Sequence, residues 1–218
     1  YPWPSAQALT EGILECDRHL AIGALEYVPA GEVAAVQATS QIHPWTVVAQ
    51  GPDKWRACLD MSVGLNRDVR SMPFGLPTVW DVRRVVKPTS CFAKADLRDG
   101  FFSVPIHPGS RNRFVMRHPG TGRLMRSARL PFGYVDSPRL FCSVTEALAD
   151  ELRRRVAGKG IHVFVFVDDF LIAGDTEEAA REGNRIFLEL LAELGLPFAP
   201  HKARGPTRVV EFLGFLLV

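Results

Sequence analysis

The stretch that decides the fold of this chain is VFVFVDDFLIAG, residues 163–174. Its flanks are strongly β-prone, yet two adjacent carboxylates stand in the middle, and Asp is depleted in strands. A buried charge is costly unless it is paired or bound to a metal. We therefore expect a β-hairpin whose tight turn carries Asp168 and Asp169 into a cleft, where carboxylates suit hard cations such as Mg²⁺. An ordinary hairpin with an Asp-Asp turn is the alternative, because turns favour Asp.

A third carboxylate, Asp96, stands upstream at the end of the segment CFAKAD, residues 91–96. The segment alternates in polarity and predicts a short strand, with a tight or helical turn expected at 98–100. Beside a hairpin that carries two further carboxylates, Asp96 would complete a two-metal site. Two metal ions about 3.5–4 Å apart can clamp the attacking and leaving oxygens of a phosphoryl displacement. The alternative role of Asp96 is that of a helix N-cap.

The remaining pattern mixes helices and strands and predicts an α+β fold, with an antiparallel sheet backed by helices. Capping residues and apolar periodicity predict helices over residues 5–25, 78–86, 137–156 and 176–194. Alternating or β-branched runs predict strands over residues 46–49, 55–61, 113–118, 124–130 and 209–218, the last as one strand or a pair. The first two of these strands are joined by a Gly-Pro-Asp turn and form an expected hairpin.

Composition limits the classes of protein to which the chain can belong. Its 218 residues, 47% hydrophobic and 23% charged, are typical of a globular protein that buries a real core. The net charge is only +2, so any surface for nucleic acid must be a local basic patch. Arginines cluster between residues 111 and 129 and again at 153–155, although a solvated face is the alternative explanation.

Four scattered cysteines form no C-x-x-C pair, which argues against zinc and against a disulfide scaffold. We therefore expect a reducing, intracellular compartment. No apolar run is long enough for a membrane span, so no membrane partner is expected. The N-terminus does not look like a signal peptide, and because the chain does not begin with Met we expect a fragment of a larger polypeptide.

Several motifs follow one another between about residue 45 and residue 218, and their order is more specific than any one of them. They are KWRACLD (54–60), GLN (64–66), ADLRDGFFSVP (95–105), LPFG (130–133) with Ser137-Pro138 and Phe141, FVDD (166–169), Lys202 after a Gly-Leu-Pro turn, and FLGF (212–215). In this order they resemble the fingers and palm of a reverse transcriptase. The resemblance is nearest to gypsy-like or DIRS-like retroelements.

The resemblance implies a polymerase palm with a fingers subdomain. Residues 1–90 would form the N-terminal helix and fingers, and 91–218 the palm, with a fingers insertion at about 105–130. No thumb or RNase H domain is expected within these residues. The implied activity is RNA-directed DNA synthesis by a retrotransposon enzyme, with a template-primer, deoxynucleotides and further domains of the same polyprotein as partners. The resemblance leaves the oligomeric state open.

The implied catalytic residues are the three carboxylates and one lysine. Asp96, Asp168 and Asp169 would hold two Mg²⁺ ions, for which Mn²⁺ can substitute, and the backbone carbonyl of Leu97 would assist. Asp168 is the more direct ligand of the hairpin pair. Lys202 would be the general acid for the pyrophosphate leaving group, with an ordinary exposed lysine as the alternative.

The resemblance also implies residues that bind the nucleotide. Phe101 stands five residues after Asp96, where reverse transcriptases carry an aromatic steric gate against the ribose 2′-hydroxyl. Arg56 matches the triphosphate-binding arginine, and Lys54 would stand in for lysines that many relatives carry just before the fingers turn and that this chain lacks at 49–52. Both could instead line an exposed strand edge. The other implied substrate contacts are Leu97, Arg98, Asp99, Gly100, Phe132 and Gly133.

Contacts with primer and template are implied for two segments of the palm. They involve Phe166 and Val167 in the FVDD box and Phe212, Leu213 and Gly214, which resemble a primer grip or form a core strand. Two other functions stay open: a different palm polymerase, such as an RNA-dependent RNA polymerase, and a domesticated or decayed fold that only binds nucleic acid or a protein. Phe101 argues against the first, and the three carboxylates argue against the second.

Overall fold

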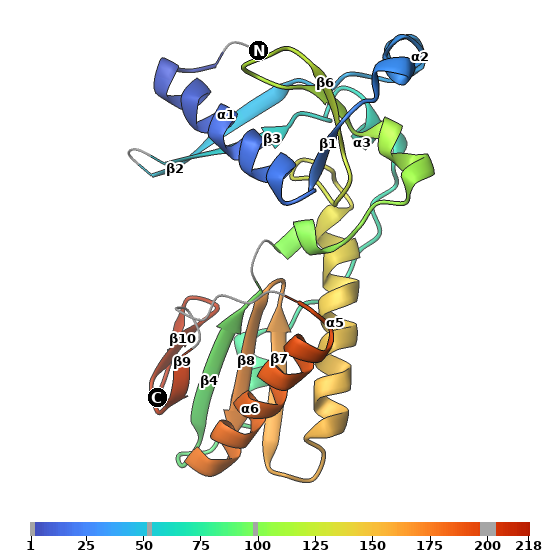
Figure 1. Cartoon of the computed structure of the whole chain (residues 1–218). Coiled ribbons are helices and arrows are strands. Elements are labelled where there is room, and N and C mark those ends of the chain that lie inside the picture. The colour runs from blue at the N-terminus through green and yellow to red at the C-terminus, as the bar shows by residue number, and fades with distance from the viewer. Residues whose placement is uncertain (1–2, 52–53, 98–99, 197–203) are drawn as a thin grey trace. The chain divides into compact units, whose positions relative to one another are not determined.

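The computed structural model describes residues 3–51, 54–97, 100–196 and 204–218 (Figure 1). The chain forms two compact units, Tyr1–Met72 with Phe101–Pro138 (the first unit) and Pro73–Gly100 with Arg139–Val218 (the second unit). Both contain helices and antiparallel strands, so the predicted α+β class is confirmed. None of the described helices is both long enough and apolar enough to cross a bilayer. The division expected at residue 90 stays a prediction.

The first unit is built on helix α1 (Ala6–Ala21) and a three-stranded antiparallel sheet of order β1-β6-β5. Ser5 begins the helix as predicted, because its hydroxyl accepts a hydrogen bond of 3.0 Å from the N–H of Ala8. The sheet comprises β1 (Leu25–Tyr27), β5 (Val115–Arg117) and β6 (Leu124–Ser127). The short elements are η1 (Ala30–Glu32), α2 (Val33–Thr39), α3 (Leu65–Asp68) and η3 (Pro108–Arg113).

A β-hairpin in the first unit carries the KWRACLD motif. Its strands are β2 (Trp45–Gly51) and β3 (Lys54–Leu59), and the register pairs Val48 with Arg56 and Thr46 with Cys58. The predicted hairpin is therefore confirmed, and each strand differs from its predicted bounds by one or two residues. After residue 100 the chain continues through η2 (Gly100–Ser103), which brings Phe101 and Phe102 into the first unit.

The second unit is a four-stranded antiparallel sheet of order β7-β8-β4-β9, with helix α6 packed on strands β8 and β4 (Figure 1). The strands are β4 (Cys91–Asp96), β7 (Ile161–Phe166), β8 (Asp169–Gly174) and β9 (Arg204–Thr207). The helices are α4 (Val79–Arg83), α5 (Ser137–Arg155, within this unit from Arg139) and α6 (Glu177–Glu193). The chain ends in a hairpin of β10 (Val210–Phe212) and β11 (Phe215–Leu217).

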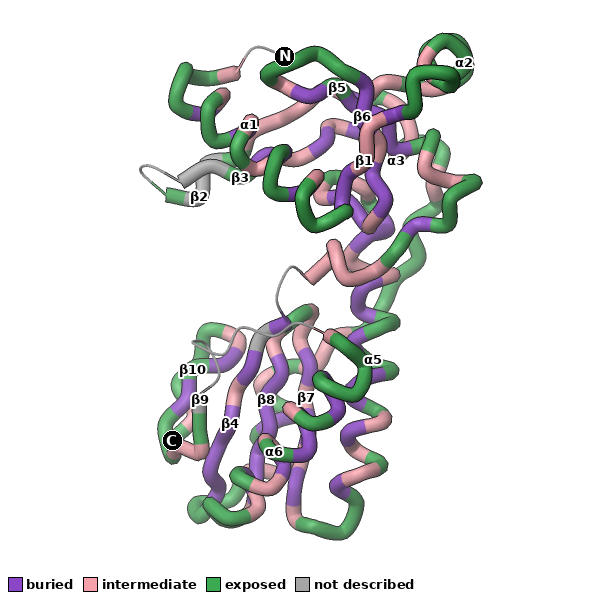
Figure 2. Tube along the Cα trace, in the orientation of Figure 1, coloured by how far each residue is buried: buried purple, intermediate pink, exposed green. Residues whose placement is uncertain are grey.

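Each face of this sheet is covered by different elements. On one face Phe170 of β8 meets Phe187 of α6 with ring centroids 4.6 Å apart. On the other face Leu171 packs with Val82 of α4 and Phe212 of β10 in one buried cluster. Figure 2 shows the resulting buried residues running along β4, β8 and β7. Burial on both faces fixes the register of β4 and β8, and with it the backbone positions of Asp96 and Asp169 at their ends.

The structure shortens several predicted elements. Residues 5–25 were predicted as one helix, but α1 ends at Ala21 and Leu25 already begins β1, because Gly23 adopts a positive φ of 69°. Residues 124–130 were predicted as one strand, but β6 ends at Ser127, and the N–H of Leu130 instead bonds the carbonyl of Val104. The helix predicted over 78–86 ends at Arg83, and residues 209–218 form a strand pair.

Candidate functional site

The turn between β7 and β8 places two carboxylates at one end of the sheet. Phe166 pairs with Asp169, so only Val167 and Asp168 lie between the strands. Val167 has a positive φ of 61°, which suits the first central residue of a two-residue hairpin loop but is strained for a β-branched side chain. Asp168 is exposed and Asp169 is half-buried.

Strand β4 brings the third predicted carboxylate residue to the same place. Asp96 pairs with Asp169 in the antiparallel register, and the N–H of Leu97 donates a 3.3 Å hydrogen bond to the carbonyl of Asp168. The backbone therefore brings Asp96, Asp168 and Asp169 together, as the sequence predicted. The side chain of Asp96 lies outside the described residues.

The surroundings of Asp168 include Gly100 and the start of helix α5. A Cβ atom on Gly100 would stand 3.9 Å from Oδ2 of Asp168 and 3.6 Å from Cζ of Phe141. Burial, together with the negative charge of Asp168, raises the pKa of the Cys142 thiol on the same helix. Cys142 therefore stays a neutral thiol near neutral pH.

The donors at this site suit a hard divalent cation. Carboxylate oxygens are the ligands that Mg²⁺ prefers, and Asp168 and Asp169 offer them at adjacent positions. Within the described ranges, however, no three His, Cys, Asp or Glu side chains are placed so that they could hold one metal ion. The chemistry of the donors fits Mg²⁺, and the assignment of ligands stays a prediction.

Sequence reasoning missed one charged partner of this site. Nζ of Lys94, on β4, lies 3.0 Å from Oδ2 of Asp169 on β8. The signal was a lysine two residues before Asp96 in the alternating segment CFAKAD, on the same side of the strand as Asp96. Its significance depends on the pairing of β4 with β8, which the sequence alone does not give.

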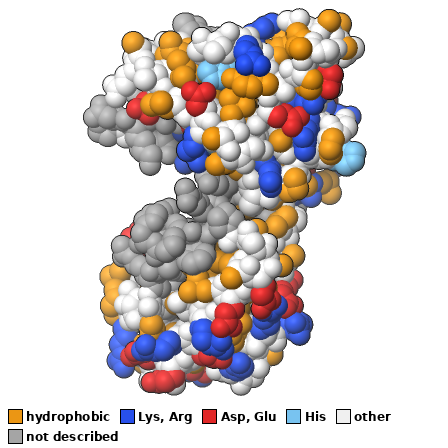
Figure 3. All heavy atoms as spheres, viewed as in Figure 1, with side chains coloured by type: hydrophobic (Ala, Val, Ile, Leu, Met, Phe, Trp, Pro, Cys, Tyr) orange, Lys and Arg blue, Asp and Glu red, His pale blue; other side chains and the backbone are white. Residues whose placement is uncertain are grey.

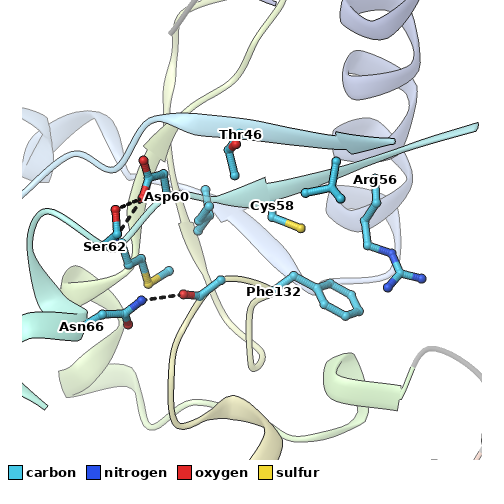
Figure 4. Close-up of a pocket in the computed structure, with 11 residues that line it drawn as sticks. Thr46, Arg56, Cys58, Asp60, Ser62, Asn66 and Phe132 are labelled. Atoms are coloured by element: carbon cyan, nitrogen blue, oxygen red, sulfur yellow. Dashed lines mark hydrogen bonds between the residues drawn. The ribbon is translucent and has the colours of Figure 1, made fainter. Parts of the chain in front are cut away.

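In the first unit, the ring of Phe132 contacts two residues that the sequence singled out, Phe101 and Arg56, and also the neighbouring Phe102. Its centroid lies 4.9 Å from the ring of Phe101 and 5.5 Å from the ring of Phe102. The guanidinium of Arg56 lies 5.0 Å from the same centroid, within the range of a cation–π contact. Figure 4 shows Arg56 on strand β3 and Phe132 facing one another at the edge of a pocket.

This pocket, of about 320 Å³, lies between the β2–β3 hairpin and the segment 132–133. Two hydrogen bonds hold this segment in place: the N–H of Leu59 donates to the carbonyl of Phe132 at 3.1 Å, and the side-chain Nδ2 of Asn66 donates to the carbonyl of Gly133 at 2.8 Å (Figure 4). Gly133 has φ 103°, and a Cβ there would stand 1.9 Å from the carbonyl oxygen of Leu59. Only glycine fits this approach.

The residues that line the pocket also include a carboxylate, that of Asp60. Asp60 accepts hydrogen bonds from the hydroxyl of Ser62 at 2.5 Å and from its N–H at 3.0 Å (Figure 4). These bonds hold the pKa of Asp60 below its ordinary value. Arg56 and Asp60 thus give the two ends of the pocket opposite charges.

The arginines at 153–155 are paired with carboxylates of the second unit. Arg153 contacts Glu146 and Asp150, whereas Arg155 contacts Glu151 and Glu193. Figure 3 shows blue and red side chains mixed on the visible face in the region of helices α5 and α6. For residues 153–155 this favours the alternative of a solvated, ion-paired face.

Of the other predicted site residues, some belong to the core or to turns of the second unit, and some lie outside the described residues. Phe212 is buried in the core cluster, and Phe166 and Leu213 pack against it, so they have a structural role whether or not they touch a primer. Leu213 and Gly214, with φ of 55° and 75°, form the turn between β10 and β11. The positions that lie outside the described residues are Arg98, Asp99, Lys202 and the side chain of Lys54.

Three kinds of comparison relate this chain to known proteins. The family model for reverse transcriptase (RNA-dependent DNA polymerase) matches residues 40–217. The Gag-Pol polyprotein of Koala retrovirus is 31% identical over 186 residues, which cover 80% of this chain and 11% of that polyprotein. The Gag-Pol polyprotein of Gibbon ape leukemia virus is 30% identical over 186 residues, with the same 80% and 11% coverage.

Solved structures agree in fold. A foamy viral protease-reverse transcriptase in complex with ds DNA has a TM-score of 0.74 and 23% identity, over 97% of this chain and 34% of that chain. The native Prototype Foamy Virus protease-reverse transcriptase has a TM-score of 0.73 and 23% identity, over 100% of this chain and 26% of that chain. The chain spans 11% of the curated relatives' length. Since the family model matches most of its residues, the chain belongs to the reverse transcriptase family.

Proposed function

We propose that this chain carries out RNA-directed DNA synthesis, adding deoxynucleotides to the 3′-hydroxyl of a primer. The observation that supports this proposal is the strand pairing that brings Asp96 opposite Asp169 and beside the Asp168 turn. A chain of this family that served only to bind nucleic acid would not need three aspartates at one end of one sheet. A retrotransposon, gypsy-like or DIRS-like, is the proposed source of the enzyme.

Asp96, Asp168 and Asp169 are proposed to hold two Mg²⁺ ions, with Mn²⁺ as a substitute. Such ions, when bound, activate the attacking hydroxyl and neutralise charge on the triphosphate. The chain's own contribution is to hold its carboxylates in place. The Leu97 N–H fixes the backbone of the Asp168 turn, and the pairing of β4 with β8 fixes that of Asp169.

The pocket of the first unit is the proposed place for nucleotide and template contacts. Arg56 would bind the triphosphate, since a guanidinium matches phosphate oxygens in a bidentate way. Phe101 would exclude the ribose 2′-hydroxyl, and Phe132 with Gly133 would lie against the base. The proposal also includes four residues whose side chains lie outside the described part of the chain: Lys54, Arg98, Asp99 and Lys202.

The proposed partners are an RNA or DNA template-primer and deoxynucleotides, within a polyprotein. An intracellular setting agrees with the four cysteines, all of which are free thiols.

The decisive experiment is primer extension on an RNA template with Mg²⁺ and deoxynucleotides at low salt, comparing wild type with Asp168→Asn. We expect extension by the wild type and a loss on the order of a hundredfold or more in the variant. Binding of a labelled template, measured by fluorescence anisotropy, should be nearly unchanged. Asp150→Asn, which removes an exposed carboxylate on α5, is the control and should extend normally.

Two results would contradict the proposal. Equal extension by wild type and Asp168→Asn would show that the carboxylate of Asp168 is not needed for catalysis. The second result is template binding without extension, found again when the assay is repeated on a longer chain. It would mean that the fold only binds nucleic acid.

A further inference from the structure

Lys94 and Asp169 form an ion pair across two central strands of the second unit. Nζ of Lys94 lies 3.0 Å from Oδ2 of Asp169, and the two side chains are 24% and 31% exposed. In the β4–β8 register Lys94 stands opposite Leu171, two positions from the pair of Asp96 with Asp169. The lysine therefore reaches diagonally along one face of the sheet to the carboxylate.

The face on which this pair lies is mostly apolar. Leu171 and Phe92, which flank Lys94 on the two strands, are both fully buried, and Phe164 and Phe166 pack against the same cluster. Asp169 stands at the border of this cluster with its side chain 31% exposed, next to the carboxylate of Asp168. A cation close to a partly buried carboxylate stabilises it.

We propose that Lys94 is a positioning residue of the carboxylate site. Its ammonium neutralises Asp169 and holds that carboxylate in a fixed place on the sheet, while Asp168 is presented at the exposed turn. The two neighbouring aspartates thus have different tasks, which the sequence motif alone does not distinguish. The part of this inference that concerns cations rests on the proposed function, and the part that concerns the ion pair does not.

The ion pair has a consequence for cation binding. Lys94 reduces the negative charge of the site by one, and its ammonium lies 3.0 Å from Oδ2 of Asp169, where it competes with a cation for that oxygen. Replacing Lys94 with an uncharged side chain should therefore strengthen the binding of a divalent cation, while the position of Asp169 becomes less fixed. The substitution is thus expected to strengthen cation binding and to weaken the positioning of Asp169, and the two effects can be measured separately.

A double-mutant cycle tests the ion pair without any metal. Urea unfolding in EDTA would compare wild type, Lys94→Met, Asp169→Asn and the double variant. We expect Lys94→Met to lower the urea midpoint when Asp169 is present and to have little effect in combination with Asp169→Asn. Additive effects of the two substitutions would overturn the proposal.

Two further variants control this cycle. Lys87→Met breaks a second Lys–Asp pair of the same unit, with Asp175 at 2.6 Å, and its effect should be the same with or without Asp169→Asn. Lys94→Arg keeps the charge and should retain most of the wild-type midpoint. If Lys94→Met does not fold, recovery of folding by the double variant would still show the coupling, and failure of both would count against it.

Direct Mn²⁺ binding, followed by electron paramagnetic resonance, tests the second part. We expect Lys94→Met to bind Mn²⁺ roughly tenfold more tightly than wild type, with Lys94→Arg and Lys87→Met unchanged. Extension at saturating Mn²⁺ should nevertheless be slower in Lys94→Met. Unchanged or weaker Mn²⁺ binding would overturn the role of Lys94 at the cation site. If no variant bound Mn²⁺, the metal-dependent function would fail, and the unfolding cycle would still decide the ion pair.

Discussion

At the scale of single residues, Phe132 connects features that are far apart in the sequence. Its ring contacts Phe101 of η2 and lies under the guanidinium of Arg56 on β3. In this chain the placement of Arg56 therefore depends on an aromatic surface.

We predict that Phe132→Leu raises the KM for deoxynucleotides roughly threefold to tenfold, because a cation–π contact at an exposed or partly desolvated site contributes about 0.5–2 kcal/mol. The measurement is steady-state extension on one template with one varied nucleotide. Phe132→Tyr keeps the ring and serves as the control. An unchanged KM in Phe132→Leu would mean that Arg56 is held by other contacts.

Phe101→Ala is predicted to raise the use of ribonucleotides, because the ring expected beneath the sugar is removed. The ratio of kcat/KM for a ribonucleotide to that for its deoxynucleotide should increase by at least about tenfold, equivalent to some 1.4 kcal/mol of discrimination. Phe102→Ala, a change in the neighbouring ring that packs against His19, is the matched control. Unchanged sugar selectivity in Phe101→Ala would refute its role as a gate.

At the scale of elements, the ends of the strands are tied by ion pairs. Lys87, which precedes β4, contacts Asp175, which follows β8, at 2.6 Å. The Lys87 ammonium holds the pKa of Asp175 below its ordinary value. A depressed pKa in the folded state means that the pair stabilises the fold above the unfolded-state pKa. This stabilisation is lost as the pH falls through the folded-state pKa.

We therefore expect Lys87→Met to lower the melting temperature near pH 7, and this difference from wild type to shrink as the pH falls below about 4, the usual pKa of Asp. Thermal unfolding followed by circular dichroism between pH 7 and pH 2.5 would measure it. A difference that stays constant over this range would show that Lys87 acts through packing rather than through its charge.

The elements that the sequence predicted well are those with local signals. Ser5 and Thr176 cap their helices through side-chain hydrogen bonds, and Gly195 follows α6 with a positive φ. Strand β1 was missed because its three residues pair with β6 about a hundred residues later, a contact that no local pattern reports. Strand β9 was missed because it contains Gly205-Pro206, residues that argue against a strand.

In the candidate site, too, the features with local signals could be predicted and those that depend on distant contacts could not. The turn with Asp168 and its meeting with the Asp96 strand end could be predicted, because a β-prone run interrupted by two carboxylates is a local signal. The ion pair of Lys94 with Asp169 and the contact of Arg56 with Phe132 could not be predicted. Both depend on the register of strands or on the packing of distant segments.

At the scale of the whole molecule, charge is balanced rather than concentrated. The net charge is +2, and Arg153–Arg155 of α5 contact carboxylates, as do Arg111 and Arg126 of the first unit. Exposed pairs of this kind contribute little to stability and are screened by salt. Binding of a nucleic acid must therefore draw on a modest number of phosphate contacts, which release counterions.

From this balance we expect stability and template binding to respond differently to salt. Raising NaCl from 50 to 300 mM should change the melting temperature by only a few degrees, whereas template affinity should fall roughly tenfold or more. Thermal unfolding and fluorescence anisotropy on the same samples would measure both. A template affinity that does not depend on salt would mean that the contacts are not made to phosphates.

The backbone of Val167 has a consequence for which substitutions this chain can tolerate. At a positive φ, the conformation of the main chain rather than the size of the side chain decides the cost of each residue, and glycine and asparagine are the least strained. The cost of a substitution at this position therefore depends on which residue is introduced. Replacement by another β-branched residue keeps the same strain, whereas replacement by glycine relaxes the turn and widens the range of positions open to the neighbouring carboxylates. A more stable variant obtained by relieving this strain is therefore expected to hold Asp168 and Asp169 less accurately in place.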